Sequence, residues 1–202
     1  MSTTPEQHQG RQARRLHTRQ RVFDAAIAEL KQTGVADADI NAIAESAGVA
    51  RGTFYFHFPT KEHVLLELEQ REEFRIARAL ERFRRRSPDL RDTFVKTVRL
   101  VTELERQLGS LLFRDLLAMH FSPTRPVDES WREHPLIIVL TEEITRAGER
   151  GEVQNAVEPH HSAMFFLLGL YGLLTSTTGT KALRQSVLDS YLTTTLRSLE
   201  PR

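Results

Sequence analysis

Cysteine is absent from the 202-residue chain, which excludes disulfide bonds and thiolate metal sites. Long hydrophobic runs are also absent. The most apolar stretch, Ala163 to Leu174, is shorter than the ~20 residues of a membrane span and contains two glycines. The N-terminus is polar and basic, without an apolar segment that resembles a signal peptide. We therefore expect a cytoplasmic protein without membrane association.

The chain also lacks a large excess of positive or negative charge, and its formal net charge is only +1. Binding to nucleic acid must therefore depend on local basic patches. The sequence has no glycine-rich phosphate loop, nucleophile elbow or carboxylate constellation, so we expect neither enzyme activity nor a cofactor. Histidines at positions 120, 134, 160 and 161 raise the question of a metal site. Adjacent side chains on a helix point about 100° apart, which favours surface and helix-end histidines over a metal site.

Apolar residues recur at helical spacing along most of the chain, and no stretch shows the alternation of a β-strand. This pattern predicts an all-α fold. The expected helices span residues 18–33, 40–47, 50–58, 61–86, 90–108, 110–121, 135–150, 159–178 and 180–198.

The stretch from Asp39 to Phe58 has the pattern of a helix-turn-helix motif, whose second helix enters the DNA major groove. Gly48 stands where the first helix ends, since glycine adopts a left-handed backbone without steric cost. Phe54 and Phe58 are four residues apart and share the buried face of the second helix. The residues expected to lie largely off that face are Arg51, Thr53, Tyr55, Phe56 and His57.

These side chains suit contact with DNA. Arg51 can reach a guanine edge or a phosphate, and Phe56 can touch a thymine methyl group or a deoxyribose. Hydrogen-bond donors for phosphate oxygens come from Thr53, Tyr55 and His57, with Lys61 as a further phosphate contact. An aromatic-rich run is more often plain core, but five consecutive rings cannot all be buried on one short helix.

The segment from Ile43 to Leu65 resembles the signature of the TetR family of bacterial transcriptional regulators, and the resemblance extends upstream through the stretch from Thr18 to Gly34. The matching residues are Ile43-Ala44, Ala47-Gly48-Val49, Gly52-Thr53-Phe54-Tyr55, His57-Phe58 and Lys61. The resemblance implies an N-terminal three-helix DNA-binding domain at 14–62. It also implies a C-terminal helical domain at 63–202 for effector binding and dimerisation. The positions where the family contacts DNA are Asn41, Arg51, Gly52, Thr53, Tyr55, Phe56, His57 and Lys61.

The sequence departs from the family pattern in two ways. Ala50 stands where a serine or threonine usually caps the recognition helix, and loss of such a cap costs roughly 0.5–2 kcal/mol. Threonines common before the first motif helix are replaced by Ala38 and Ile40, which leaves Asp39 as the candidate cap. Because a carboxylate is repelled by phosphate, we interpret Asp39 as a cap and not as a DNA ligand.

The resemblance further implies a homodimeric repressor that binds a palindromic operator. A small effector would release it by moving the helix that begins at Lys61. Composition favours an apolar or amphipathic effector, and the two last helices suit a dimer interface because the first of them is apolar nearly all round. Candidate pocket residues, for each of which ordinary core is the simpler interpretation, are Phe94, Phe113, Met119, His120, Phe121, Trp131, Phe165 and Tyr171.

Five arginines near the N-terminus, with no acidic residue among them, leave two interpretations open: an arm that contacts DNA, or a solvated basic terminus. They are Arg11, Arg14, Arg15, Arg19 and Arg21. Two rival functions also remain. One is a helical ligand carrier or interaction protein that has lost specific operator binding, which Ala50 and Asp39 leave possible. The other is a regulator that responds to a protein partner instead of an effector.

Overall fold

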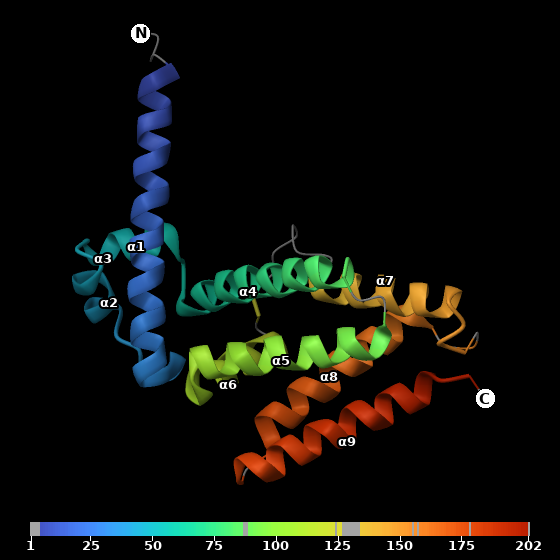
Figure 1. Ribbon diagram of the computed structural model, residues 1–202. Helices are drawn as coiled ribbons and strands as arrows, with labels where there is room; N and C mark the ends of the chain where they lie inside the picture. The colour runs from blue at the N-terminus through green and yellow to red at the C-terminus, as the bar shows by residue number, and fades with distance from the viewer. Residues whose placement is uncertain are drawn as a thin grey trace. The chain divides into compact units, whose positions relative to one another are not determined.

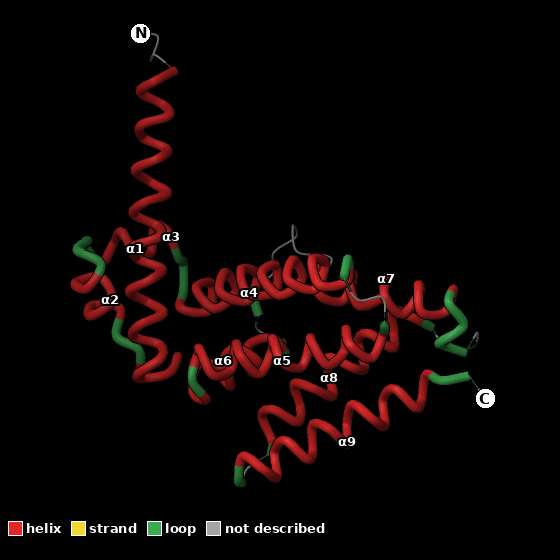
Figure 2. The backbone as a smooth tube through the Cα atoms, in the orientation of Figure 1, coloured by secondary structure: helices red, strands yellow, loops and turns green. Residues whose placement is uncertain are grey.

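The computed structural model of the protein describes residues 5–86, 89–123, 125–126, 134–154, 156, 158–177 and 179–201. Within these ranges all regular secondary structure is helical, as Figure 2 shows. The helices are α1 (Pro5–Asp37), α2 (Ile40–Ser46), α3 (Arg51–His57), α4 (Lys61–Arg84), α5 (Leu90–Leu108), α6 (Ser110–His120), α7 (Pro135–Glu149), α8 (Pro159–Ser176) and α9 (Lys181–Leu199) (Figure 1). The prediction of an all-α fold is confirmed, and from α2 onward each expected helix is present.

Helix α1 differs most from expectation, because it begins at Pro5 and runs beyond Gly34 to Asp37. Its helical geometry is interrupted at Gly34, where φ is 77° and ψ is 172°. Any residue with a side chain would be strained at this position for two reasons. The positive φ is unfavourable for residues other than glycine, and a Cβ atom would lie only 3.1 Å from Oδ2 of Asp115. The same carboxylate of Asp115, on α6, accepts a hydrogen bond of 2.8 Å from the Val35 amide. Helix α6 therefore packs where α1 is kinked.

The chain forms two compact units. The first contains the described residues up to Leu68 together with α6 and its flanks, Leu108–Pro126. The second contains Glu69–Gln107 and the described residues from position 134 onward. The functional division expected from the resemblance, 14–62 and 63–202, differs from this grouping by placing α6 with the C-terminal helices, and it stays a prediction.

The part of the first unit's core that positions the motif is built by α1, α2, α3 and the start of α4. Its fully or almost fully buried side chains include Val22, Leu30, Ile43, Phe54, Phe58 and Val64. The rings of Phe54 and Phe58 are 6.1 Å apart, and Phe58 lies 6.3 Å from Phe23 of α1. Burial of these three aromatic side chains contributes apolar stabilisation and fixes α3 against α1.

In the second unit, Phe94 of α5 stacks on Phe166 of α8 with ring centroids 4.2 Å apart. A buried ion pair joins α4 to α7: Arg84 Nε donates to Glu143 Oε2 at 2.8 Å, and the two side chains are 4% and 2% exposed. Glu143 also pairs with Arg150 at 3.0 Å, and Arg84 also pairs with Glu142 at 3.2 Å, so the buried pair belongs to a network of four charged side chains. Across the described residues no helix has both the length and the apolarity that a membrane crossing requires.

Candidate nucleic-acid interface

The turn between α2 and α3 is fixed by local capping. Asp39 Oδ1 accepts a hydrogen bond of 2.8 Å from the Asn41 amide, so the interpretation of Asp39 as an N-cap is confirmed. Gly48 has a φ of 63°, the left-handed conformation expected after the first motif helix. Val49 closes the turn, with its amide 3.0 Å from the Ala44 carbonyl. At the start of α3, Ala50 provides no side-chain cap, as the sequence indicated.

Two arginines of α1 support this motif by binding backbone carbonyls. Arg21 donates to the Ala47 carbonyl at the end of α2. Arg19 donates to the His57 carbonyl at the end of α3, pairs with Glu67 of α4, and lies 4.2 Å over the Phe58 ring. Sequence reasoning grouped both arginines with the N-terminal arm. Nothing in a helical pattern indicates which arginine binds a carbonyl that is distant in sequence, so this role was missed.

One side of α3 is open to solvent. Tyr55 is 39% exposed and Phe56 is 65% exposed, and Arg51 and Gly52 are exposed as well. Arg51 donates to Oδ1 of Asn41 and to the Tyr55 hydroxyl, both at 3.3 Å. The hydrogen bond with Tyr55 raises the pKa of Arg51, which therefore stays cationic. Asn41, Arg51 and Tyr55 thus form one connected polar group that spans α2 and α3.

Thr53 and His57 lie deeper than the other predicted contacts. Thr53 is half-buried, and His57 is only 7% exposed, so the expectation that His57 lies off the packed face of α3 is wrong. Burial lowers the pKa of His57, and the nearby guanidinium groups of Arg19 and Arg15 lower it further. His57 is therefore a neutral imidazole at pH 7. A DNA contact by its remaining exposed edge stays a prediction.

Lys61, which is predicted to contact phosphate, also forms hydrogen bonds within the protein. Its Nζ atom donates to the carbonyls of Ala36 at 3.1 Å and Ala38 at 3.2 Å, which ties the start of α4 to the connection between α1 and α2. An ammonium group has three donors, so one remains beyond these two bonds.

The described candidate pocket residues are divided between the two compact units. Phe113, Met119, His120 and Phe121 lie on or beside α6 in the first unit, whereas Phe94, Phe165 and Tyr171 lie in the second. Phe94 and Phe113 are buried in the cores of their units, but Phe121 is 55% and Phe165 66% exposed. Burial raises the pKa of the Tyr171 hydroxyl, and the carboxylates of Glu73 and Glu69 raise it further. Trp131 lies outside the described residues.

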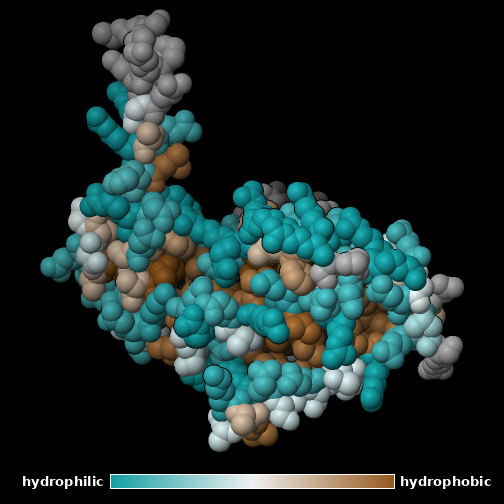
Figure 3. Space-filling view, in the orientation of Figure 1, coloured by the Kyte–Doolittle hydropathy of each residue, from teal (hydrophilic) through white to brown (hydrophobic). Residues whose placement is uncertain are grey.

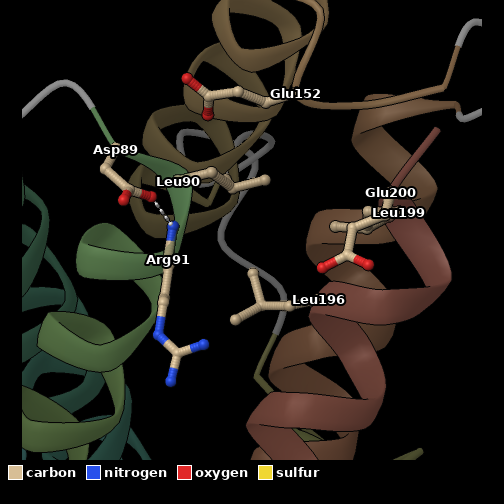
Figure 4. A pocket seen from close by; sticks show the side chains of 7 residues that line it. All are labelled: Asp89, Leu90, Arg91, Glu152, Leu196, Leu199 and Glu200. Atoms are coloured by element: carbon tan, nitrogen blue, oxygen red, sulfur yellow. Dashed lines mark hydrogen bonds between the residues drawn. The ribbon is translucent and has the colours of Figure 1, made fainter.

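A cleft of about 400 Å³ opens at one end of the second unit, between the start of α5 and the end of α9. Figure 4 shows Asp89 and Arg91 on one side and Leu196 and Glu200 on the other. Asp89 caps α5 through a 2.6 Å hydrogen bond from the Arg91 amide, so its carboxylate already has a partner. The cleft contains no residue from the predicted pocket, and its charged rim differs from the apolar lining that we expected.

Helices α8 and α9 pack closely but leave apolar surface uncovered. A Cβ atom at position 169 would lie only 2.5 Å from the Tyr191 hydroxyl oxygen. That hydroxyl donates a hydrogen bond of 2.6 Å to the Phe166 carbonyl. Helix α9 therefore approaches α8 closely at Gly169. Gly172 faces open space, and Phe165, Leu168 and Leu183 are 66%, 45% and 52% exposed.

Residues 22–68 match the family model described as bacterial regulatory proteins, tetR family. The chain carries a TetR-family DNA-binding domain. The match includes α2, α3 and the start of α4, and therefore all eight predicted DNA contacts.

Two curated relatives align with the same region. The HTH-type transcriptional regulator SrpR of Pseudomonas putida is 50% identical over 48 residues, which cover 24% of this chain and 22% of SrpR. The probable acrEF/envCD operon repressor of Escherichia coli K12 is 41% identical over 56 residues, 28% of this chain and 26% of that protein. Only about a quarter of each relative is therefore matched, and the similarity is confined to the TetR-type domain.

The fold is shared over a longer range. The crystal structure of Thermus thermophilus FadR, a TetR-family transcriptional repressor in complex with lauroyl-CoA, superposes with a TM-score of 0.64 and 22% identity. The superposition covers 89% of this chain and 91% of FadR. The chain therefore has the TetR arrangement of an N-terminal helix-turn-helix followed by a C-terminal helical domain.

Proposed function

We propose that the protein is a homodimeric transcriptional repressor that binds a palindromic DNA operator. The observation that carries the proposal is the solvent-open side of α3, where Arg51, Tyr55 and Phe56 project from a helix whose other side is anchored by Phe54 and Phe58. Such a helix can enter the major groove while its packed side holds its orientation. The proposed contacts are Asn41, Arg51, Gly52, Thr53, Tyr55, Phe56, His57 and Lys61.

The surface of α8 and α9 supports the proposal that the protein dimerises through these two helices. Phe165, Leu168 and Leu183 are large apolar side chains that a single chain leaves exposed, and the open position at Gly172 allows a partner helix to approach closely. Two copies joined there would carry two α3 helices, one for each half-site of a palindrome. Half-sites about one helical turn apart, ~34–36 Å, suit such a dimer.

The effector is proposed to be small and apolar or amphipathic. Support comes from the FadR structure, whose bound lauroyl-CoA is amphipathic, and from the apolar character of the C-terminal helices. Effector binding would shift α4 and so change the distance between the two α3 helices. A coupling free energy of roughly 1–3 kcal/mol would change operator affinity several-fold to about a hundredfold. The candidate pocket residues remain part of this proposal.

The proposed role is non-enzymatic. The proposed location is the cytoplasm, because bacterial DNA is found there. Both curated relatives are named as a transcriptional regulator or an operon repressor. The rival proposal, a carrier without operator binding, is favoured by the missing side-chain cap at Ala50. Against it, the carboxylate of Asp39 is used as a cap within the protein and is not a free anion on the α3 surface.

A footprint of the purified protein on the DNA upstream of its own gene, at two salt concentrations, tests the proposal. A protected palindrome with strong salt dependence is expected. The same complex would then be titrated with lauroyl-CoA and other apolar compounds to find those that release it. Absence of protection on that DNA, on neighbouring promoters and on genome-wide fragments at low salt would favour the carrier.

A further inference from the structure

The N-terminal part of α1 is helical and open to solvent. Every residue from Gly10 to His17 is exposed, and Leu16 is 60% exposed. In Figure 1 this part of α1 projects beyond α2 and α3, and in Figure 3 hydrophilic side chains extend from both of its sides. We name Gly10–His17 the basic arm. A helical segment with so little tertiary packing is held mainly by the helix that it continues, and a bound partner would stabilise it further.

The positive charges of the arm lower the stability of its helical conformation. Arg11 and Arg15 are four residues apart, and Arg11 and Arg14 are three apart, so their guanidinium groups are neighbours on the helix surface. Like charges at these spacings destabilise an isolated helix. No acidic residue occurs between Gly10 and Phe23 to compensate for them. A polyanion placed along this ridge would remove the repulsion and add charge-assisted hydrogen bonds.

Two arginines connect α1 to α3, one within the basic arm and one in the turn that follows it. The Arg15 guanidinium lies over the ring of Phe56, 5.1 Å from its centroid, and Phe56 belongs to the open face of α3. One turn further along α1, Arg19 binds the His57 carbonyl and Glu67, which fixes α1 against the end of α3 and the start of α4. The direction of the arm is therefore set by the same helix that is proposed to enter the groove.

We propose that the basic arm is a second DNA-binding element, which uses Arg11, Arg14 and Arg15 to bind the phosphates of the duplex next to the groove occupied by α3. This inference rests on the proposed operator binding and extends its contact surface. From Arg15 to Arg11 the helix rises about 6 Å, which corresponds to about two further base pairs of one strand. Phosphate contacts position a protein without reading sequence, so the arm strengthens binding to all sequences alike.

The test uses the full-length chain with Arg11→Gln and Arg14→Gln combined. Both side chains are exposed, and glutamine is a good helix former, so the fold and the Arg15–Phe56 contact are retained. A matched control combines Arg85→Gln and Arg86→Gln, which removes the same charge from exposed positions at the end of α4. The probe is a duplex that the wild-type protein selects from a random-sequence pool, and the readouts are the salt dependence of affinity and a hydroxyl-radical footprint.

For the arm variant, the slope of log affinity against log salt should fall by about 0.9 for each arginine removed, while sequence preference is retained. Its footprint should lose about two base pairs at each outer edge. The control should match the wild type in both readouts. An arm variant with the wild-type slope and footprint would overturn the inference and leave a solvated basic terminus. If the wild-type protein selects no sequence from the pool, it is the proposed operator binding that fails.

Discussion

The substitution Gly48→Ala tests how the turn between α2 and α3 is held. Gly48 has a φ of 63°, where a Cβ atom costs roughly 1–2 kcal/mol. The new methyl group would also lie 2.7 Å from Nη2 of Arg21, so the guanidinium must move away from the Ala47 carbonyl that it binds.

Loss of the hydrogen bond between Arg21 and the Ala47 carbonyl costs less than loss of a buried hydrogen bond. A hydrogen bond from a charged group contributes about 1.5–3 kcal/mol when it is shielded, and Arg21 is exposed, so we take about 1 kcal/mol for its loss. The two contributions together lower the free energy of unfolding by roughly 2–3 kcal/mol. For a chain of this length the melting temperature should fall by about 4–12 °C.

Urea titration followed by the helical circular dichroism signal measures this difference. A double-mutant cycle with Arg21→Ala separates the two contributions, because in that background Gly48→Ala should cost only the backbone part, about 1–2 kcal/mol. Gly148→Ala is the control, since Gly148 lies inside α7 with nothing within 4 Å of the added methyl group. A Gly48→Ala protein as stable as the wild type would refute the strained turn. Equal costs in both backgrounds would refute the contact with Arg21.

Four further predictions concern the DNA-binding surface and the C-terminal helices. Tyr55→Phe and Lys61→Ala should weaken binding to all DNA sequences by similar factors without changing the dimer mass measured by light scattering, and wild-type affinity in a shift assay would contradict both assignments. Arg51→Ala should weaken binding and, if Arg51 reads a base, relax sequence preference in selected pools. Gly169→Ala should displace Tyr191 and destabilise the chain by about 1–3 kcal/mol, and Tyr191→Ala should relieve the clash in the double variant. Because the pKa of His57 is lowered by folding, the unfolded chain binds its proton more readily, so stability should fall as pH drops below about 6.5; His57→Gln should flatten this part of a pH–stability profile.

Periodicity and capping residues were sufficient to place the helices from α2 onward. Helix ends coincide with signals that act locally, such as Pro59 after α3 or Asp39 before α2. Helix α1 was expected only from Thr18 because the residues before it lack an apolar stripe. A helix that extends into solvent has no such stripe, so hydrophobic periodicity cannot reveal it.

The site was predicted less completely, for a related reason. Sequence position identifies which residues lie on the motif, and Arg51, Tyr55 and Phe56 are indeed exposed. The burial of His57 depends on α1 and α4, which close over the last turn of α3 through Arg19 and Glu67. Contacts between elements distant in the chain decide such cases, and no local pattern records them.

The distribution of basic residues around α3 has a consequence for how the protein would bind DNA. Arg19, Arg21 and Lys61 all bind backbone carbonyls within the first unit. Each would have to weaken an internal bond to give its full charge to a phosphate, so they contribute less to counterion release than a count of basic residues suggests. We therefore expect the salt-dependent part of affinity to come mainly from the basic arm, and the sequence-dependent part from Arg51 and its neighbours on α3. A protein with a net charge of only +1 can bind DNA in this way, because the basic residues that hold the first unit together differ from those that contact phosphates.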